Sequence, residues 1–184
     1  AADGAEVDRL LRANGAREIA AATTPVDRAR LWQGRKKAFG ALGRIAPDLA
    51  VQDAVVPRSI LPDILDRIAE IRDRLGLQIS NVFHAGDGNL HPCISYDRRD
   101  PDQARRVQVA SREIMQICLA AGGSITGEHG VGSDKMEYMP EAFDPPSLEV
   151  MCEVRRVFDP GIRANPGKVF PLHTCREWRR RGVA

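Results

Sequence analysis

Three of the four histidines of this chain fall in two short glycine-rich segments, HAGDGNLH (84–91) and GEHG (127–130). Imidazole nitrogen binds divalent metals such as Zn, Mn and Fe, and imidazole also exchanges protons near neutral pH. No other part of the sequence concentrates such residues. These two segments are therefore the candidates for the chemistry of the chain.

The first segment, 84–91, has the pattern of a β-hairpin in which a glycine-containing turn joins two strands. A turn of about five residues brings the flanking strand ends together, so we expect His84 and His91 to be neighbours. Gly86 and Gly88 are expected to supply the positive φ values that such a turn needs. Two imidazoles held in this way would form half of a metal site.

Glu128 is the candidate for the third ligand, because it lies in a loop whose glycines let the backbone approach other elements closely. Two histidines and one carboxylate leave coordination positions open, as catalytic metal sites do. In an extended segment the side chain of His129 would point away from that of Glu128, which leaves His129 free for another role. The alternative is that the glycines and histidines only form hydrogen-bonded turns.

The sequence resembles the C-terminal substrate or cap domain of FAD-linked 2-hydroxyacid oxidoreductases of the vanillyl-alcohol-oxidase superfamily, which include glycolate oxidase flavoprotein subunits and D-lactate dehydrogenases. The resemblance covers about residues 3–171. It rests on these segments, in chain order: LWQGRK (31–36), DAVVPR (53–58), HAGDGNLHP (84–92), GEHGVG (127–132) and NPGKVFP (165–171).

The resemblance implies a reaction. A small 2-hydroxy acid would bind to a divalent metal, Zn or Mn/Fe, held by His84, His91 and Glu128, and hydride would pass to FAD to give a 2-oxo acid. His129 resembles the catalytic base of the family. The chain would thus be part of an FAD-dependent oxidoreductase that acts on the CH–OH group of its substrate.

The resemblance also implies contacts with the substrate and the cofactor. Arg35 resembles the arginine that binds the substrate carboxylate, although on a helix rich in Arg and Lys it could be only a solvated residue. Asn165 and Lys168 resemble residues that touch FAD. Where relatives acting on larger diacids have an asparagine and a lysine, this chain has Cys93 and Val51, which favours glycolate or D-lactate as substrate.

Family members carry a large N-terminal domain that holds most of the FAD contacts, and this chain shows no counterpart of it. We therefore expect residues 1–171 to be the cap domain alone, inactive by itself, followed by a basic tail, 172–184. The chain would be either a domain excised from a longer enzyme or a truncated gene product. The expected partners are the FAD-binding domain or the subunits of a glycolate oxidase complex.

The composition is that of a globular protein, 43% hydrophobic and 28% charged over 184 residues. A net charge of +2 gives no reason to expect nucleic acid as a partner, and no apolar run reaches membrane-spanning length. The four cysteines form no CxxC pair, which argues for a reducing compartment and against a disulfide framework. We expect a cytoplasmic location, with contact at the inner face of the membrane as the alternative.

Helical and strand patterns alternate along the chain. We expect strands near 17–22 and 51–56 and on both sides of the hairpin turn, and helices ending near Asn14 and over about 25–42, 59–75, 102–121 and 146–158. Helices that segregate to one side of hairpin-linked strands indicate an α+β fold. The resemblance implies the same class, with an antiparallel ferredoxin-like sheet flanked by helices.

Two other functions fit the same residues. His84, His91 and Glu128 could form the metal site of a free-standing metallohydrolase, with His129 as the base, although no HExxH helix supports this. Alternatively, the chain could be a non-catalytic assembly module. Metal content separates the module from the two enzymes, and an FAD-binding domain in the same protein separates the oxidoreductase from the hydrolase.

Overall fold

The structure is a computed structural model that describes residues 2–170. The chain divides into two compact units, residues 1–41 and 42–184. The histidines of both glycine-rich segments belong to the second unit, so the fold of that unit positions them.

The first unit is helical and carries α1 (Ala2–Ala13) and α2 (Pro25–Leu42). α2 begins where the sequence predicted, because Thr24 Oγ1 accepts a 3.1 Å hydrogen bond from a first-turn backbone N–H. The strand predicted over 17–22 is wrong, since these residues have no regular structure. A strand needs a partner for its backbone groups, and none of the elements described in residues 2–41 is a strand.

The second unit contains an antiparallel sheet made of β1 (Asp48–Val51), β2 (Ala54–Val55), β3 (Gln78–His84) and β4 (Asn89–Tyr96). β4 is central, with β3 on one side and both β1 and β2 on the other. Val51 lies opposite Cys93 and Ala54 lies opposite Leu90, so β1 and β2 keep one register along β4. They are two parts of the strand predicted near 51–56, and Asp53 lies between them.

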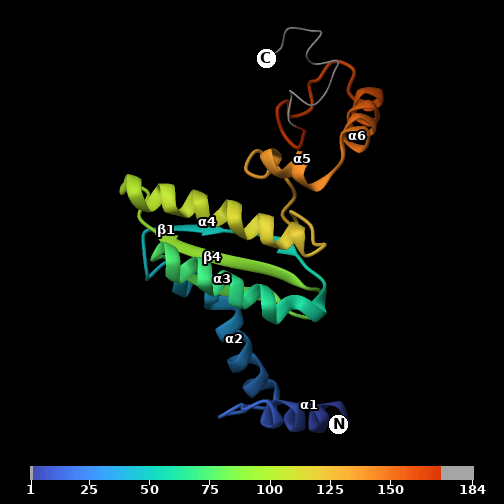
Figure 1. Cartoon of the computed structure of the whole chain (residues 1–184). Coiled ribbons are helices and arrows are strands. Elements are labelled where there is room, and N and C mark those ends of the chain that lie inside the picture. The colour runs from blue at the N-terminus through green and yellow to red at the C-terminus, as the bar shows by residue number, and fades with distance from the viewer. Residues whose placement is uncertain (1, 171–184) are drawn as a thin grey trace. The chain divides into compact units, whose positions relative to one another are not determined.

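Two helices, α3 (Leu61–Leu75) and α4 (Pro101–Ala120), lie side by side on one face of this sheet (Figure 1). α3 follows the 3₁₀ turn η1 (Arg58–Ile60) and ends, as predicted, at residue 75; the next residue, Gly76, caps it with a φ of 58°. The buried residues that these helices contribute to the core recur at helical spacing and are Leu61, Ile64, Ile68, Ile71, Val107, Ala110, Ile114, Met115, Ile117 and Cys118.

Alternation along β4 decides which face the site occupies. Leu90 and Ile94 are fully buried in the core with the two helices. Successive side chains of a strand point to opposite faces, so His91 and Cys93 lie on the face that α3 and α4 leave uncovered. The candidate site is therefore built on the face of the sheet opposite α3 and α4.

The order of elements confirms the predicted fold class. β1 and β2 form the first strand, and α3, β3, β4 and α4 follow. An isolated bridge between Val55 and Ser124 then extends the sheet beyond β2. This is the order of a β-α-β-β-α-β ferredoxin-like unit whose last strand is reduced to a bridge.

The remaining described elements are η2 (Met136–Tyr138), α5 (Met139–Ala142) and α6 (Pro145–Phe158). None of the helices within residues 2–170 combines the length and the apolar character needed to cross a membrane. The predicted basic tail, 172–184, lies outside the described residues.

The cysteines depart in part from the expectation. Cys93 and Cys118 are free and buried, and burial raises the pKa of the Cys118 thiol to about 11. Cys152, however, is disulfide-bonded, a pairing that the argument against a disulfide framework did not anticipate. Distance along the sequence does not decide which thiols meet, because pairing depends on the separation of the Cα atoms in the fold.

Candidate functional site

The β3–β4 hairpin places His84 and His91 beside each other, as the sequence predicted. His84 ends β3 and His91 lies near the start of β4, with ring centroids 5.5 Å apart. Of the two turn glycines, only Gly88 has a positive φ, 72°, so the expectation for Gly86 is wrong. Gly88 is also required sterically, because a Cβ there would lie 2.1 Å from the carbonyl oxygen of Val56.

Glu128 completes the predicted group of three. Its Oε1 lies 3.0 Å from His91 Nε2 and 3.7 Å from His84 Nε2. One ligand atom from each of the three residues lies within 4.8 Å of the other two. Ligands bound to one ion at about 2.1 Å are separated by at most about 4.2 Å, so both measured carboxylate–imidazole distances fit a shared cation.

The hydrogen bonding of His91 also favours a cation at this place. His91 Nδ1 lies 3.3 Å from the carbonyl oxygen of Gln52, which can only accept a hydrogen bond, so the tautomer that carries its proton on Nδ1 fits this contact. The lone pair of Nε2 then faces the carboxylate oxygen of Glu128 at 3.0 Å. Two acceptors this close need a shared proton or metal ion. A backbone carbonyl that orients a ligating histidine is a common support of metal sites.

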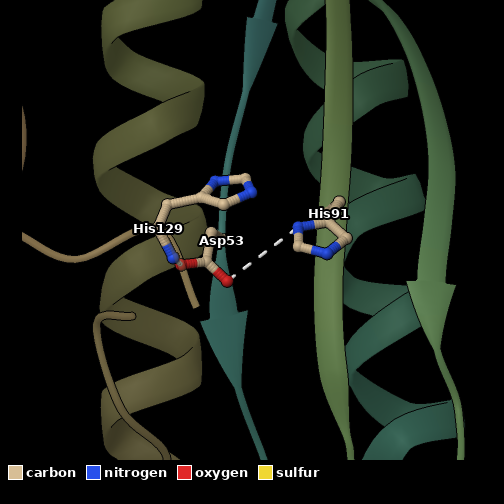
Figure 2. Close-up of side chains that lie close together, drawn as sticks. All are labelled: Asp53, His91 and His129. Carbon is tan, nitrogen blue, oxygen red and sulfur yellow. Dashed lines mark hydrogen bonds and ion pairs between the residues drawn. The ribbon is translucent and has the colours of Figure 1, made fainter. Parts of the chain in front are cut away.

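Asp53 is a central residue of the site that the sequence argument did not identify. The shared register of β1 and β2 places Asp53 opposite His91, and its side chain is 0% exposed. One carboxylate oxygen lies 3.9 Å from His91 Nδ1 (Figure 2). Two signals in the sequence pointed to it: a single acidic residue inside an otherwise uncharged strand run, and its place at the start of the segment DAVVPR (53–58).

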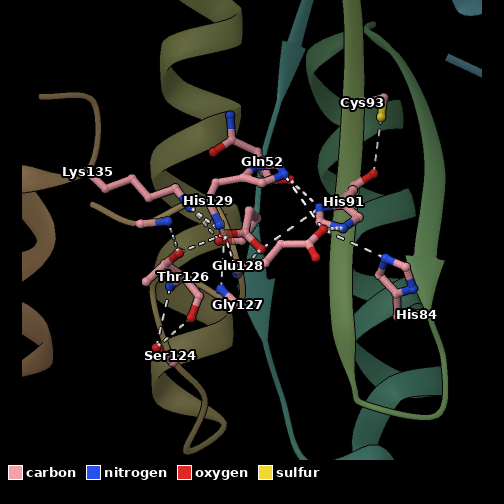
Figure 3. A network of polar contacts seen from close by, with 12 residues as sticks. Gln52, His84, His91, Cys93, Ser124, Thr126, Gly127, Glu128, His129 and Lys135 are labelled. Carbon is pink, nitrogen blue, oxygen red and sulfur yellow. Dashed lines mark hydrogen bonds and ion pairs between the residues drawn. The ribbon is translucent and has the colours of Figure 1, made fainter. Parts of the chain in front are cut away.

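The Asp53 carboxylate holds the loop that carries Glu128. It accepts hydrogen bonds from three consecutive backbone N–H groups, those of Gly127, Glu128 and His129, at 2.9–3.2 Å, and from the Thr126 hydroxyl at 2.7 Å (Figure 3). Residues more than 70 positions away in the sequence thus meet at one buried carboxylate. This arrangement fixes the backbone from which the Glu128 and His129 side chains project.

Charge and hydrogen bonds keep Asp53 ionised. Burial alone opposes ionisation, but the hydrogen bonds from His129, Thr126 and Gly127 and the charge of Lys135 outweigh it and hold the pKa of Asp53 well below its usual value. Lys135 is 8% exposed, and its ammonium lies 3.2 Å from the carboxylate and 2.7 Å from the Asp53 carbonyl oxygen. Burial lowers the pKa of Lys135, and the Asp53 charge partly offsets that effect.

The expectation that Glu128 and His129 point in opposite directions is wrong. His129 Nε2 lies 3.8 Å from Glu128 Oε1, and the His129 ring stacks on that of His91 with centroids 5.0 Å apart. Side chains alternate only in an extended chain, whereas the N–H groups of 127–129 all turn toward Asp53. His129 also lines a cleft of about 730 Å³ beside β1 and α4, so a small molecule can reach its imidazole.

A second group of possible ligands shares His91. One atom each of Asp53, His91 and His129 also lies within 4.8 Å of the others. The Asp53 carboxylate is already engaged by three backbone amides, a hydroxyl and an ammonium. Glu128, by contrast, has a half-exposed side chain. The set of His84, His91 and Glu128 is therefore the better metal site.

The other predicted residues lie on other elements. Arg35 is on α2 in the first unit, so its role stays a prediction. Asn165 and Lys168 lie in the irregular segment after α6, where their carbonyl oxygens accept hydrogen bonds from Arg155. That segment is hydrogen-bonded to the GEHGVG segment (127–132), because the Val169 N–H donates to the Gly132 carbonyl oxygen at 3.1 Å.

Comparison with known proteins gives consistent matches. The family model described as FAD linked oxidases, C-terminal domain, matches residues 1–169. The chain is 42% identical over 172 residues to glycolate oxidase subunit GlcD of Escherichia coli (strain K12), which covers 93% of this chain and 34% of that protein. It is 34% identical over 182 residues to GlcD of Bacillus subtilis (strain 168), covering 99% of this chain and 38% of that protein.

A third relative has a different name. The chain is 34% identical over 156 residues to the mitochondrial D-lactate dehydrogenase (cytochrome) of Arabidopsis thaliana, which covers 84% of this chain and 28% of that protein. The chain thus spans about a third of the length of these relatives.

Proposed function

The chain belongs to the family of FAD-linked oxidase C-terminal domains, and from that premise we propose that it is the substrate- and metal-binding domain of an FAD-dependent 2-hydroxyacid dehydrogenase. The observation that carries the proposal is the meeting of His84, His91 and Glu128, from two distant segments, at distances that suit one divalent ion. The proposed partner is an FAD-binding domain, in the same protein or in another subunit.

We propose the following roles for the residues of this chain in the reaction. His84, His91 and Glu128 would hold the ion, which when bound would supply a Lewis acid that favours loss of the substrate hydroxyl proton. His129 accepts that proton at Nε2, and Arg35 binds the substrate carboxylate in a forked ion pair.

The remaining roles concern FAD. Asn165 and Lys168 would contact the cofactor, which when bound would accept the hydride from the substrate α-carbon. Asp53 holds the loop from which Glu128 would reach the ion and His129 would reach the substrate.

A small monocarboxylate is the proposed substrate class. Glycolate and D-lactate appear in the names of the relatives. Val51 lies directly opposite Cys93 across β1 and β4, and Cys93 is the next residue after His91 on the same face. The two substitutions that remove polar contacts for a second carboxylate therefore fall at one place beside the site, which supports glycolate or D-lactate over a diacid.

We expect the purified chain to bind about one divalent ion, because three ligand atoms converge and leave positions open. Elemental analysis after mild dialysis, and calorimetric titration with Mn²⁺ and Zn²⁺, would measure the stoichiometry. The double substitution His84→Ala, His91→Ala should abolish binding. Unchanged stoichiometry in that variant would refute the assignment, and circular dichroism would verify that the variant is folded.

We also expect the chain alone neither to retain FAD nor to oxidise 2-hydroxy acids, because only the segment around Asn165 and Lys168 is proposed to touch the cofactor. The absorption spectrum of the purified chain would reveal a bound flavin. Adding the FAD-binding domain of the same enzyme should give flavin reduction by glycolate or D-lactate. Flavin bound by the chain alone, or no reduction after reconstitution, would contradict the proposal.

A further inference from the structure

Asn89 is a polar residue of the site region that neither the motif argument nor the mechanism uses. It begins β4 directly opposite His84, and paired residues of antiparallel strands point to the same face. Asn89 is 7% exposed, and its side-chain oxygen Oδ1 is buried without a hydrogen-bond partner among the described residues.

An unpaired buried amide oxygen lowers stability, because it loses its hydrogen bonds to water without replacing them. An apolar residue of the same shape would avoid this loss. Asn89 therefore does not serve the packing of the core, and its position beside His84 points to a role in the site.

Gly127 lies directly against the Asn89 amide. A Cβ added to Gly127 would be 2.6 Å from Cγ, Oδ1 and Nδ2 of Asn89, closer than such atoms approach each other. Gly127 does not have a positive φ, so its backbone conformation does not require glycine. The absence of a side chain at this position is thus explained by the approach of Asn89.

We propose that Asn89 is a positioning residue of the candidate metal site: its amide sets how closely Gly127, and with it Glu128, approaches His84 and His91. Asp53 holds this loop by its N–H groups, while Asn89 supports it where it meets the hairpin. The unpaired Oδ1 is available to accept a hydrogen bond from what the site binds. This inference rests on the proposed metal site and adds a residue to it.

The test is a set of Mn²⁺ titrations of the full chain. The electron paramagnetic resonance signal of free Mn²⁺ is measured at each step and gives the affinity. Gly127→Ala should weaken Mn²⁺ binding by about 10- to 100-fold, the usual effect of changing a support of metal ligands. In an Asn89→Ala background the same substitution should change affinity by no more than about twofold, because the clashing atoms are gone. Gly86→Ala is the matched control, since a Cβ there meets nothing within 4 Å.

Asn89→Leu separates positioning from structural support. Leucine has a similar volume and no unpaired oxygen, so the thermal midpoint should equal or exceed that of the wild type. Its branched methyl end replaces the flat, polar amide that Gly127 lies against, so Mn²⁺ affinity should fall by about tenfold or more. A residue that only supports the fold would lower the midpoint and the affinity together, and that result would overturn the inference.

The other outcomes are also decisive. Wild-type affinity in Gly127→Ala, or an equal loss from this substitution in both backgrounds, would overturn the role of Asn89 and leave the proposed site standing. If the wild type binds no Mn²⁺ or Zn²⁺, the proposed metal site fails and the inference fails with it.

Discussion

Replacing His129 with Asn, in an enzyme that combines this chain with its FAD-binding domain, is expected to slow flavin reduction by glycolate or D-lactate by about 10²- to 10⁴-fold. This is the usual contribution of a general base. His129 Nε2 is the imidazole nitrogen that lies beside Glu128 without belonging to the preferred ligand set. Rapid mixing of the oxidised enzyme with substrate would give the rate, and substrate affinity should change less than the rate.

The metal and FAD contents of the His129→Asn enzyme determine how a slower rate of flavin reduction is interpreted. If both equal those of the wild type, the loss belongs to proton transfer. A loss of metal would instead place His129 among the ligands, which the second group of Asp53, His91 and His129 makes chemically conceivable. A rate near that of the wild type with metal in place would mean that the base lies elsewhere.

Asp53→Asn is expected to destabilise the chain by about 3–5 kcal/mol, the usual effect of removing one partner of a buried ion pair. The substitution leaves the Lys135 ammonium buried without its counter-charge. It also turns an amide N–H₂ or a weaker acceptor toward the three loop N–H groups. Urea unfolding followed by circular dichroism would measure the change in the free energy of unfolding.

Two further variants control the Asp53 experiment. Adding Lys135→Met to Asp53→Asn should recover part of the lost stability, because it removes the unpaired charge. Asp73→Asn breaks an exposed ion pair with Arg72 and should change stability by less than about 1 kcal/mol. An equally small effect of Asp53→Asn would show that the buried carboxylate does not hold the loop as described.

Features encoded by short-range patterns were predictable from the sequence. The apolar stripe of α3, which ends at Gly76, and the hairpin that joins His84 to His91 depend on residues close in the sequence, and both are confirmed. The strand predicted over 17–22 was wrong because a strand depends on a partner, and local residue preferences cannot supply one.

The residues that form the site were predictable from the two glycine-rich segments, but the contacts between those segments were predictable only in part. Glu128 was correctly expected to join the two histidines. The direction of His129 was predicted wrongly, because it depends on hydrogen bonds to Asp53 from a distant strand. The approach of Asn89 to Gly127 is also a long-range contact, and no local sequence pattern predicts it.

The most direct test of the central claim is anomalous diffraction from crystals of the chain grown with Mn²⁺, measured where manganese scatters anomalously. We predict one peak in contact with His84 Nε2, His91 Nε2 and a Glu128 carboxylate oxygen, with His129 outside the ligand set. A peak among Asp53, His91 and His129, or no peak in this region at saturating Mn²⁺, would contradict the account.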